Sequence, residues 1–308
     1  MTSILASFFT GFVNSLPTTF TEGFVWGILA MGVYISYRVL DVPDMTVDGS
    51  LALGGIVSAM LTVNGWNVFL TIPIAILCGA LAGVVTALLH TKLKIPAILS
   101  GILTMFALYS INIRILGNRS SQSLVGLPSV KDSLSSLFNI PFQYSNLIFA
   151  FIVMAIIVAI LYWFFGTQLG SSIRATGCNI DMARAQGINT DNMKILGLAI
   201  SNAIAALAGC LLTQLQGSAD VNMASGTIVI GLASVVIGEI IFSNKVSFWL
   251  KLSGAVVGAT VYRLIIVIAL LLGMPTSDLK LVTALLVAIA LALPLIKGIK
   301  AKGGRKNA

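Results

Sequence analysis

Long apolar runs with very few charges recur along the whole chain, and they constrain its fold more than any other feature. A helix needs about 20 predominantly apolar residues to cross a bilayer, and several of the runs approach that length. In lipid each run must satisfy its own backbone hydrogen bonds, which favours helices over isolated strands. The expected segments span residues 16–37, 49–63, 67–91, 95–116, 145–165, 193–216, 227–242, 248–272 and 278–296.

The composition excludes proteins that fold in water. Of the 308 residues 57% are hydrophobic and only 9% are charged, whereas about 25% of the residues of a soluble domain are charged. So few ionic groups cannot cover a soluble fold of this size. We therefore expect an all-α polytopic membrane protein with about 8–10 transmembrane helices, some of them discontinuous. No polar stretch is long enough for a separate domain, so residues 1–308 are expected to form a single transmembrane domain.

The placement of basic residues predicts the orientation of the chain. Cytoplasmic loops of membrane proteins carry an excess of lysine and arginine, and here the excess falls on the side that holds the basic tail 297–308. The C-terminus is therefore expected in the cytoplasm and the N-terminus outside. Residues 1–15 are apolar but short, which leaves open whether they lie on the outer interface or cross. The cytoplasmic set outside the tail is Lys92, Lys94, Arg174, Arg184, Lys194, Lys245 and Lys251, against Arg119, Lys131 and Lys280 on the outer side.

Two of the connectors between these segments are long. The outer connector, residues 117–144, could receive a partner, gate a path or be a plain structural loop. The inner connector, residues 166–192, contains a short helix with its own caps. Asn179 is a good N-cap, and Asp181 suits the positive end of the helix dipole. Gly187 stands where a left-handed residue commonly ends a helix.

This short cytoplasmic helix needs a packing partner, because two turns are not stable alone. It offers Ile180, Met182 and Ala183 as small apolar contacts and Arg184 as a fixed charge. Its own membrane domain and a separate cytoplasmic protein are the two candidate partners.

Two of the apolar segments, 49–63 and 227–242, are short and begin at glycine-containing turns. Short, glycine-interrupted helices in corresponding halves of a transporter often mark the transport path. Misplaced helix ends would explain the short segments equally well.

The break before the first short segment carries several polar residues. Asp48 precedes a glycine and is expected to cap the next helix. For Asp44 capping and a polar lining both remain open, since irregular backbone inside a membrane is tolerated only beside protein or water. The candidate residues for a translocation path or helix break are Asp44, Thr46, Asp48, Gly49, Glu239 and Arg263.

Charged groups inside the membrane are usually paired or functional. Glu239 and Arg263 lie in sequential segments, so we expect them to form an ion pair with the charged atoms within about 4 Å. Glu22 is expected to reach the lipid headgroups. Tyr109, Asn112 and Asn118 could be polar residues at the outer mouth of a path, although ordinary helix polarity explains them as well.

Four stretches of the chain resemble one family. They are Arg174–Asn189 (RATGCNIDMARAQGIN), Pro43–Gly55 (PDMTVDGSLALGG), Lys92–Met105 and Gly231–Ile241. Together they look like the permeases of ABC importers of the branched-chain amino acid and ribose type, over about residues 20 to 296. The similarity is greatest to the subgroup associated with tryptophan, tyrosine or uncharacterised substrates. Branched-chain permeases proper have a histidine-containing motif where this chain has Thr46-Val-Asp48, which argues against leucine-type cargo.

The resemblance implies a permease subunit of an ATP-driven importer in the bacterial cytoplasmic membrane. Its cargo would be a small solute, in the first place an amino acid, with aromatic amino acids as one option. Two permease copies would form the pathway, ATPase subunits would dock on the coupling helices, and an external binding protein, a lipoprotein, would deliver the cargo. No nucleic acid is implied. The residues that match the coupling pattern are Asn179, Asp181, Met182, Ala183, Arg184 and Gly187.

The sequence itself also indicates that ATP binding and hydrolysis belong to another subunit. A nucleotide-binding P-loop needs Gly-Lys followed by Ser or Thr, and no Gly-Lys dipeptide occurs in this chain. We therefore expect ATP and Mg²⁺ to be bound by a partner and no cofactor or enzymatic activity here. The alternative is an ion-coupled secondary transporter that uses Glu239 or Asp44 as its coupling carboxylate. No convergent nucleophile, metal or acid–base set supports an enzyme, and His90 lacks triad or metal-ligand spacing.

Overall fold

The computed structural model describes residues 2–127, 142–242, 247–275, 278–289 and 292, and these residues are mostly helical. The elements are α1 (Thr2–Tyr34), η1 (Ile35–Val39), α2 (Thr46–Val63), α3 (Val68–Thr91), α4 (Ala97–Ile115), β1 (Ser121–Ser123), α6 (Phe142–Gly166), α7 (Gln168–Cys178), α8 (Ile180–Ala185), α9 (Thr190–Gln216), β2 (Ser218–Asp220), α10 (Thr227–Ile241) and α11 (Phe248–Leu271). A further short apolar helix covers Leu279–Ile289.

The all-α polytopic fold predicted from the apolar runs is confirmed. Six helices in the described ranges, α2, α3, α4, α6, α9 and α11, are long and apolar enough to cross a membrane. Helix α10 is apolar but shorter. The N-terminal residues belong to α1, which is one continuous helix from Thr2 that includes Pro17. Residues 2–15 therefore extend the first helix and are not a separate segment.

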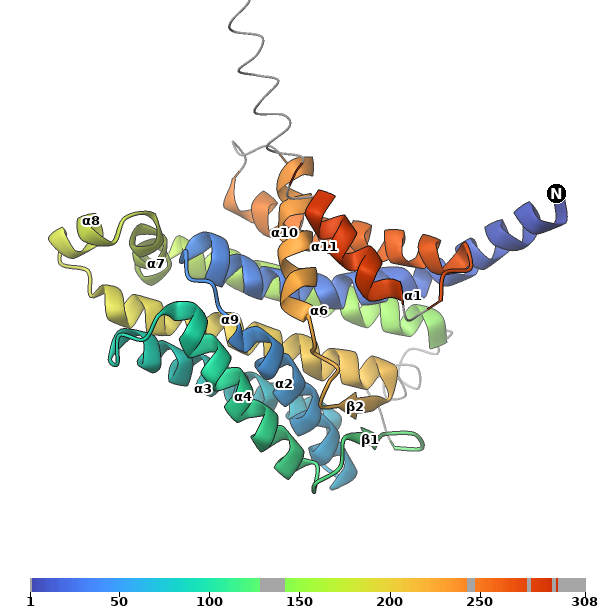
Figure 1. Cartoon of the computed structure of the whole chain (residues 1–308), viewed down its shortest axis with the longest axis horizontal. Helices are drawn as coiled ribbons and strands as arrows, with labels where there is room; N and C mark the ends of the chain where they lie inside the picture. Colours follow the sequence, from blue (N-terminus) through green and yellow to red (C-terminus); the bar gives the residue numbers. More distant parts are fainter. Residues whose placement is uncertain (1, 128–141, 243–246, 276–277, 290–291, 293–308) are drawn as a thin grey trace, which may run out of the picture.

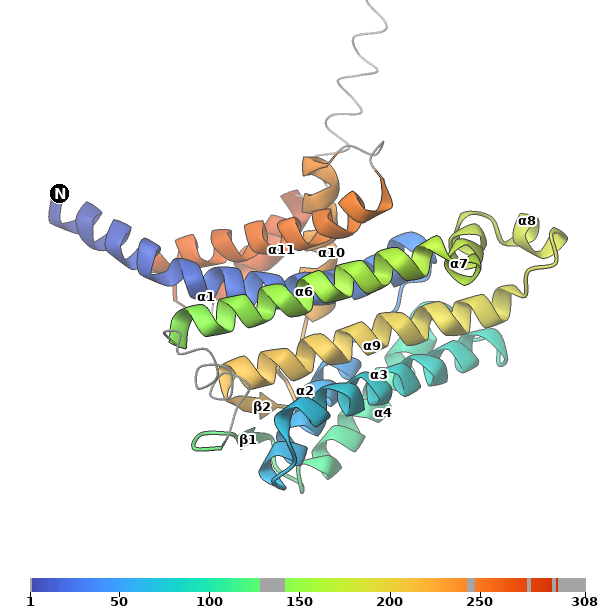
Figure 2. The ribbon, with the colours of Figure 1, turned by 180° about the vertical axis from the view of Figure 1, so that it is seen from behind.

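The helices form two groups that meet along α1 and α9 (Figures 1 and 2). In the first group α9 packs against α2 and α3, and α4 packs against α2. In the second group α1 packs against α11, α6 and α10, and α10 packs against α11. The two groups touch where α1 contacts α9. The apolar core runs through this junction and draws mainly on α1, α2 and α9.

Helices α2 and α9 approach each other closely because glycine stands at their contact points. A Cβ added to Gly209 would collide with the backbone oxygen of Leu51, and one added to Gly54 would collide with the backbone of Ala206. By contrast α6 presents large apolar side chains outward, among them Phe151, Ile156 and Trp163. An apolar outer surface of this kind suits a helix that faces lipid.

The two long connectors lie toward opposite ends of the molecule. Helices α7 and α8 stand at one end of the long axis, and β1 and β2 lie toward the other, on the side of the N-terminus (Figures 1 and 2). The strands pair antiparallel, with Gln122 opposite Ala219. They join the chain after α4 to the chain after α9. Residues 128–141 of the predicted outer connector and the basic tail 297–308 lie outside the described residues.

Candidate functional site

The chain leaves the helical conformation between η1 and α2, and Asp44 binds this non-helical segment to α9. One carboxylate oxygen of Asp44 accepts the Thr46 amide at 2.8 Å, and the other accepts Nδ2 of Asn202 at 2.6 Å. Asn202 in turn accepts the Ser50 hydroxyl at 2.7 Å. Asp44 is only 3% exposed, so the cluster is sealed within the protein. Thr46 lies there too, and its hydroxyl meets that of Thr86 at 2.7 Å.

Asp48 does not cap its own helix, so that prediction is wrong. Helix α2 begins two residues earlier, at Thr46, and Asp48 lies in its first turn. The carboxylate instead caps α10, where it accepts the Thr227 hydroxyl at 2.7 Å and the amides of Ile228 at 2.8 Å and Gly226 at 3.1 Å. The first amides of a helix have no partner within the helix, and a negative charge there is favourable. Asp48 therefore joins α2 to α10.

The sequence does contain one signal for this contact. The N-cap position of α10 is Gly226, which has no side chain to accept the free amides and makes no side-chain cap. A short apolar helix that begins this way must find its cap on another element. The sequence shows the need for a partner, but it cannot show that the partner lies 178 residues away.

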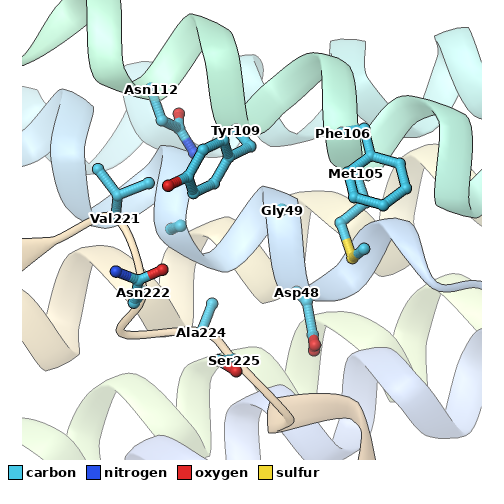
Figure 3. Close-up of a pocket in the computed structure, with 11 residues that line it drawn as sticks. Asp48, Gly49, Met105, Phe106, Tyr109, Asn112, Val221, Asn222, Ala224 and Ser225 are labelled. Atoms are coloured by element: carbon cyan, nitrogen blue, oxygen red, sulfur yellow. The ribbon is translucent and has the colours of Figure 1, made fainter. Parts of the chain in front are cut away.

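A cavity of about 380 Å³ opens beside Asp48, between α2, α4 and the segment that leads into α10 (Figure 3). Among the described residues, its wall contains one carboxylate, no cation, and a mixture of amide, hydroxyl, aromatic and aliphatic groups. Pockets that take small molecules are commonly of this size, with a few polar groups in an apolar wall. The lining residues are Asp48, Gly49, Ala52, Met105, Phe106, Tyr109, Asn112, Val221, Asn222, Ala224 and Ser225.

Asn112 is the unusual residue in this wall. It is 1% exposed, and its Oδ1 has no hydrogen-bond partner. A buried polar atom without a partner is costly and calls for an explanation. Of the three polar residues predicted near the outer mouth, Tyr109 and Asn112 line the cavity and Asn118 does not. Of the predicted path residues, Asp48 and Gly49 also line it. Asp44 and Thr46 are buried and do not line it, and neither do Glu239 and Arg263.

The predicted ion pair between Glu239 and Arg263 is wrong. Glu239 pairs with Arg38 of η1 through both carboxylate oxygens, with Arg38 Nε 2.7 Å from Oε1. Arg263 pairs with Glu22 of α1, which therefore does not simply reach the headgroups. Helices α10 and α11 do pack together, as sequential segments should, but α1 contacts both of them. The two charges turn toward α1 and η1 and not toward each other.

The short helix predicted within the inner connector is present as α8, with the expected caps. The Asn179 side chain accepts the Met182 amide at 2.9 Å, and Asp181 lies in the first turn. Gly187 follows the helix with a φ of +81°, a conformation that glycine adopts without steric cost. The helix end and its exit are thus set by local sequence.

Helix α8 is packed against the protein on one side and exposes apolar side chains on the other. Ala183 is fully buried, while Ile180 is 38% and Met182 46% exposed. Arg184 donates through Nε to the Thr190 hydroxyl at 2.9 Å and lies 3.6 Å from a carboxylate oxygen of Asp191. These contacts join α8 to the first turn of α9.

No cluster of three or more potential metal-ligating His, Cys, Asp or Glu side chains occurs in the described ranges. The single histidine, His90, places Nδ1 2.8 Å from the Ile95 carbonyl oxygen and Nε2 3.3 Å from Lys194. Both contacts suit a structural residue at the end of α3. The residues around the cavity and on α8 are therefore the two groups with a functional interpretation.

Comparison with known proteins places these features in a family. The profile of branched-chain amino acid transport system permease components matches residues 4–292. A tyrosine transport system permease protein of Clostridioides difficile is 41% identical over 280 residues, which cover 91% of each chain. An uncharacterised protein of Rickettsia prowazekii is 32% identical, covering 91% of this chain and 98% of its own. The autoinducer 2 import system permease protein of Yersinia enterocolitica is 27% identical, covering 85% and 70%. This chain therefore belongs to the branched-chain amino acid type family of ABC transport permeases, as its sequence motifs indicated.

Proposed function

We propose that this chain is the membrane-spanning subunit of an ATP-driven importer that carries an aromatic amino acid across the bacterial cytoplasmic membrane. Family membership supports a transport permease. The 41% identity to a tyrosine transport permease supports the cargo class. The cavity between α2, α4 and the start of α10 supplies a space of suitable size within the helices.

The exposed apolar surface of α8 is the observation that carries the coupling part of the proposal. Ile180 and Met182 project from a helix whose other side is packed and whose end is bonded to α9. Bare apolar side chains on a short, fixed helix suit the groove of a second protein. An ATPase subunit bound there would supply the energy of nucleotide binding and hydrolysis, and α8 would transmit the displacement.

A continuous series of contacts leads from α8 to the cavity. Arg184 ties α8 to α9, and Asn202 of α9 holds Asp44 at the start of α2. Asp48, one turn along α2, holds the first amides of α10 and lines the cavity. A shift of α9 would thus reach the α2–α10 junction through hydrogen bonds. Alternating access requires only that the ATPase favours one arrangement of these helices over the other.

The two ends of the molecule suit two different surroundings. The α8 end would face the cytoplasm, with Lys92, Lys94 and Arg174 in nearby connectors, as the positive-inside rule requires. The β1–β2 end and the N-terminus would then lie outside, where a lipoprotein could deliver the cargo. A second permease copy would complete the pathway, as the family resemblance implies.

Uptake of radiolabelled L-tyrosine into membrane vesicles that contain the whole transport system tests this proposal. Uptake should need ATP inside the vesicle and should survive a protonophore and a sodium ionophore. An ion-coupled carrier would show the opposite dependence, and that result would overturn the proposal.

A pair of matched variants tests the docking surface. Met182→Asp should abolish both ATP-dependent uptake and copurification of the ATPase, because it places a charge in an apolar contact. Val125→Asp makes a similar change at the opposite end, at a side chain that is 88% exposed, and should retain the ATPase. Equal retention by the two variants would remove α8 as the docking element.

A further inference from the structure

The cavity wall carries both polar and apolar side chains, and α4 and the segment before α10 each contribute both kinds. Figure 3 shows Met105 and Phe106 of α4 across the cavity from Asn222 and Ser225, which precede α10, with Asp48 below Met105. Asp48 gives this end a negative charge, and none of the described residues that line the cavity is a cation that would neutralise it. An occupant with an ammonium group is therefore favoured at the Asp48 end.

Asn112 marks the other end of the same cavity. It stands seven residues beyond Met105 on α4, about 10 Å along the helix axis at 1.5 Å per residue. Its Oδ1 has no partner although the residue is 1% exposed. An asparagine side chain presents either an acceptor or a donor when it turns about its last torsion, so its complement can be of either kind. The missing partner is a polar group on whatever occupies this end.

We propose that the cavity is a cargo-binding site for an amino acid and that Asn112 selects a side chain with a polar group at its far end. The ammonium lies toward Asp48, and the carboxylate receives donors from Asn222 and Ser225. The ring lies against Met105 and Phe106, and the phenol hydroxyl of tyrosine or the indole N–H of tryptophan reaches Asn112. This assignment rests on the proposed function and adds to it a site and a rule of selectivity.

The rule separates tyrosine from phenylalanine, which differ only in the hydroxyl. A site built to bond a ligand hydroxyl disfavours the analogue without it, because the buried protein group then stays unpaired. One such bond corresponds to about a 10-fold difference in affinity. Removal of the ammonium should weaken binding at the Asp48 end instead.

Direct binding of tritiated L-tyrosine tests the rule with the full chain in its complex with the ATPase, reconstituted in lipid nanodiscs. The delivery protein is left out, since its own selectivity would mask that of the permease. Unlabelled L-phenylalanine and 3-(4-hydroxyphenyl)propanoate, which lacks the ammonium, serve as competitors. Both should compete at least about 10-fold less well than unlabelled tyrosine. Equal competition by phenylalanine would overturn the role of Asn112.

The variant Asn112→Leu separates selection from a structural role. An apolar side chain of similar size removes the unpaired oxygen, so the variant should unfold at the same temperature as the wild type or higher. Its preference for tyrosine over phenylalanine should fall from about 10-fold to within about 2-fold. A retained preference in the folded variant would show that the unpaired amide is only a packing defect.

The control variant is Thr104→Val on the same helix. The Thr104 hydroxyl is buried and donates to the Ser100 carbonyl within α4, away from the cavity lining. This change should leave the preference intact, and a loss equal to that of Asn112→Leu would overturn the assignment. If the wild-type complex drives ATP-dependent uptake but binds no tyrosine in the nanodisc, the site fails while the proposed function stands. Absence of any ATP-dependent uptake would instead refute the function.

Discussion

The two sides of α2 differ in how they are joined to their neighbours. Toward α9 the contact is dense, with Gly54 and Gly209 allowing the backbones to touch and Asp44 sealed among hydrogen-bond partners. Toward α10 the contact is sparse and polar, with Asp48 on the first amides of a short helix beside an open cavity. Both junctions use an aspartate, four residues apart, in very different surroundings.

This difference indicates which part of the protein can move. A close-packed helix pair has few alternative arrangements, because its interdigitated atoms resist small displacements. Hydrogen bonds from a carboxylate to a helix end beside a cavity can break and reform with water or cargo in their place. We therefore expect α2 and α9 to move as one unit and α10 to shift against them.

Removal of the sealed aspartate should have the largest effect on stability. Asp44→Ala leaves the Thr46 amide and an amino hydrogen of Asn202 buried without their acceptor. Such unsatisfied groups cost about 1–3 kcal/mol each, so the free energy of unfolding should fall by about 3 kcal/mol. Chemical denaturation in detergent micelles measures the change.

Asp44→Asn provides the control for this prediction. Its oxygen still accepts the Thr46 amide, and Asn202 can turn its own amide so that Ser50 accepts and the new amino group donates. The loss should then be about 1 kcal/mol. Equal losses for Asn and Ala would show that the negative charge, and not the hydrogen bonding, holds α2 on α9.

The local features of the molecule were predictable from sequence, because local sequence determines them. The caps of α8 follow from Asn179 and Gly187, which act on amides and torsions within a few residues. The apolar runs predicted most of the membrane helices to within a few residues, since lipid requires a length and a composition, but the first run placed the start of α1 14 residues too late. The family resemblance likewise rests on short stretches of continuous sequence, such as Arg174–Asn189.

The long-range partners were not predictable from sequence. Glu239 lies 201 residues from Arg38, and Asp48 lies 180 residues from Ile228. Helices that follow each other in sequence are expected to pack together, as α10 and α11 do. However, α1 contacts both of them, and residues of α1 and η1 form the ion pairs with Glu239 and Arg263. The cavity is unpredictable for a related reason, since Asn112 and Asn222 come together only when α4 packs beside the chain that enters α10.

Removal of the aspartate at the mobile junction should have a smaller effect on stability and a larger one on transport. Asp48→Ala removes the cap of α10, and loss of a cap costs about 1–2 kcal/mol. Water from the cavity can reach the freed amides, which limits the cost below that of Asp44→Ala. Denaturation and ATP-dependent uptake should be measured on the same preparation. A larger loss of stability for Asp48→Ala than for Asp44→Ala would reverse the comparison.

A substitution at the opposite end of α10 should have the smallest effect on stability. Glu239 and Arg38 form a good bidentate pair, but both side chains are partly exposed, and exposed pairs contribute about 0–1 kcal/mol. Glu239→Gln should lower the free energy of unfolding by less than about 1 kcal/mol, and a double-mutant cycle with Arg38→Gln measures the coupling. ATP-dependent uptake should largely persist, because the carboxylate serves as the partner of a fixed cation and not as a carrier of protons. Complete loss of uptake in a variant that is folded and retains the ATPase would revive Glu239 as a coupling carboxylate and would move the functional end of α10 from Asp48 to the Arg38 contact.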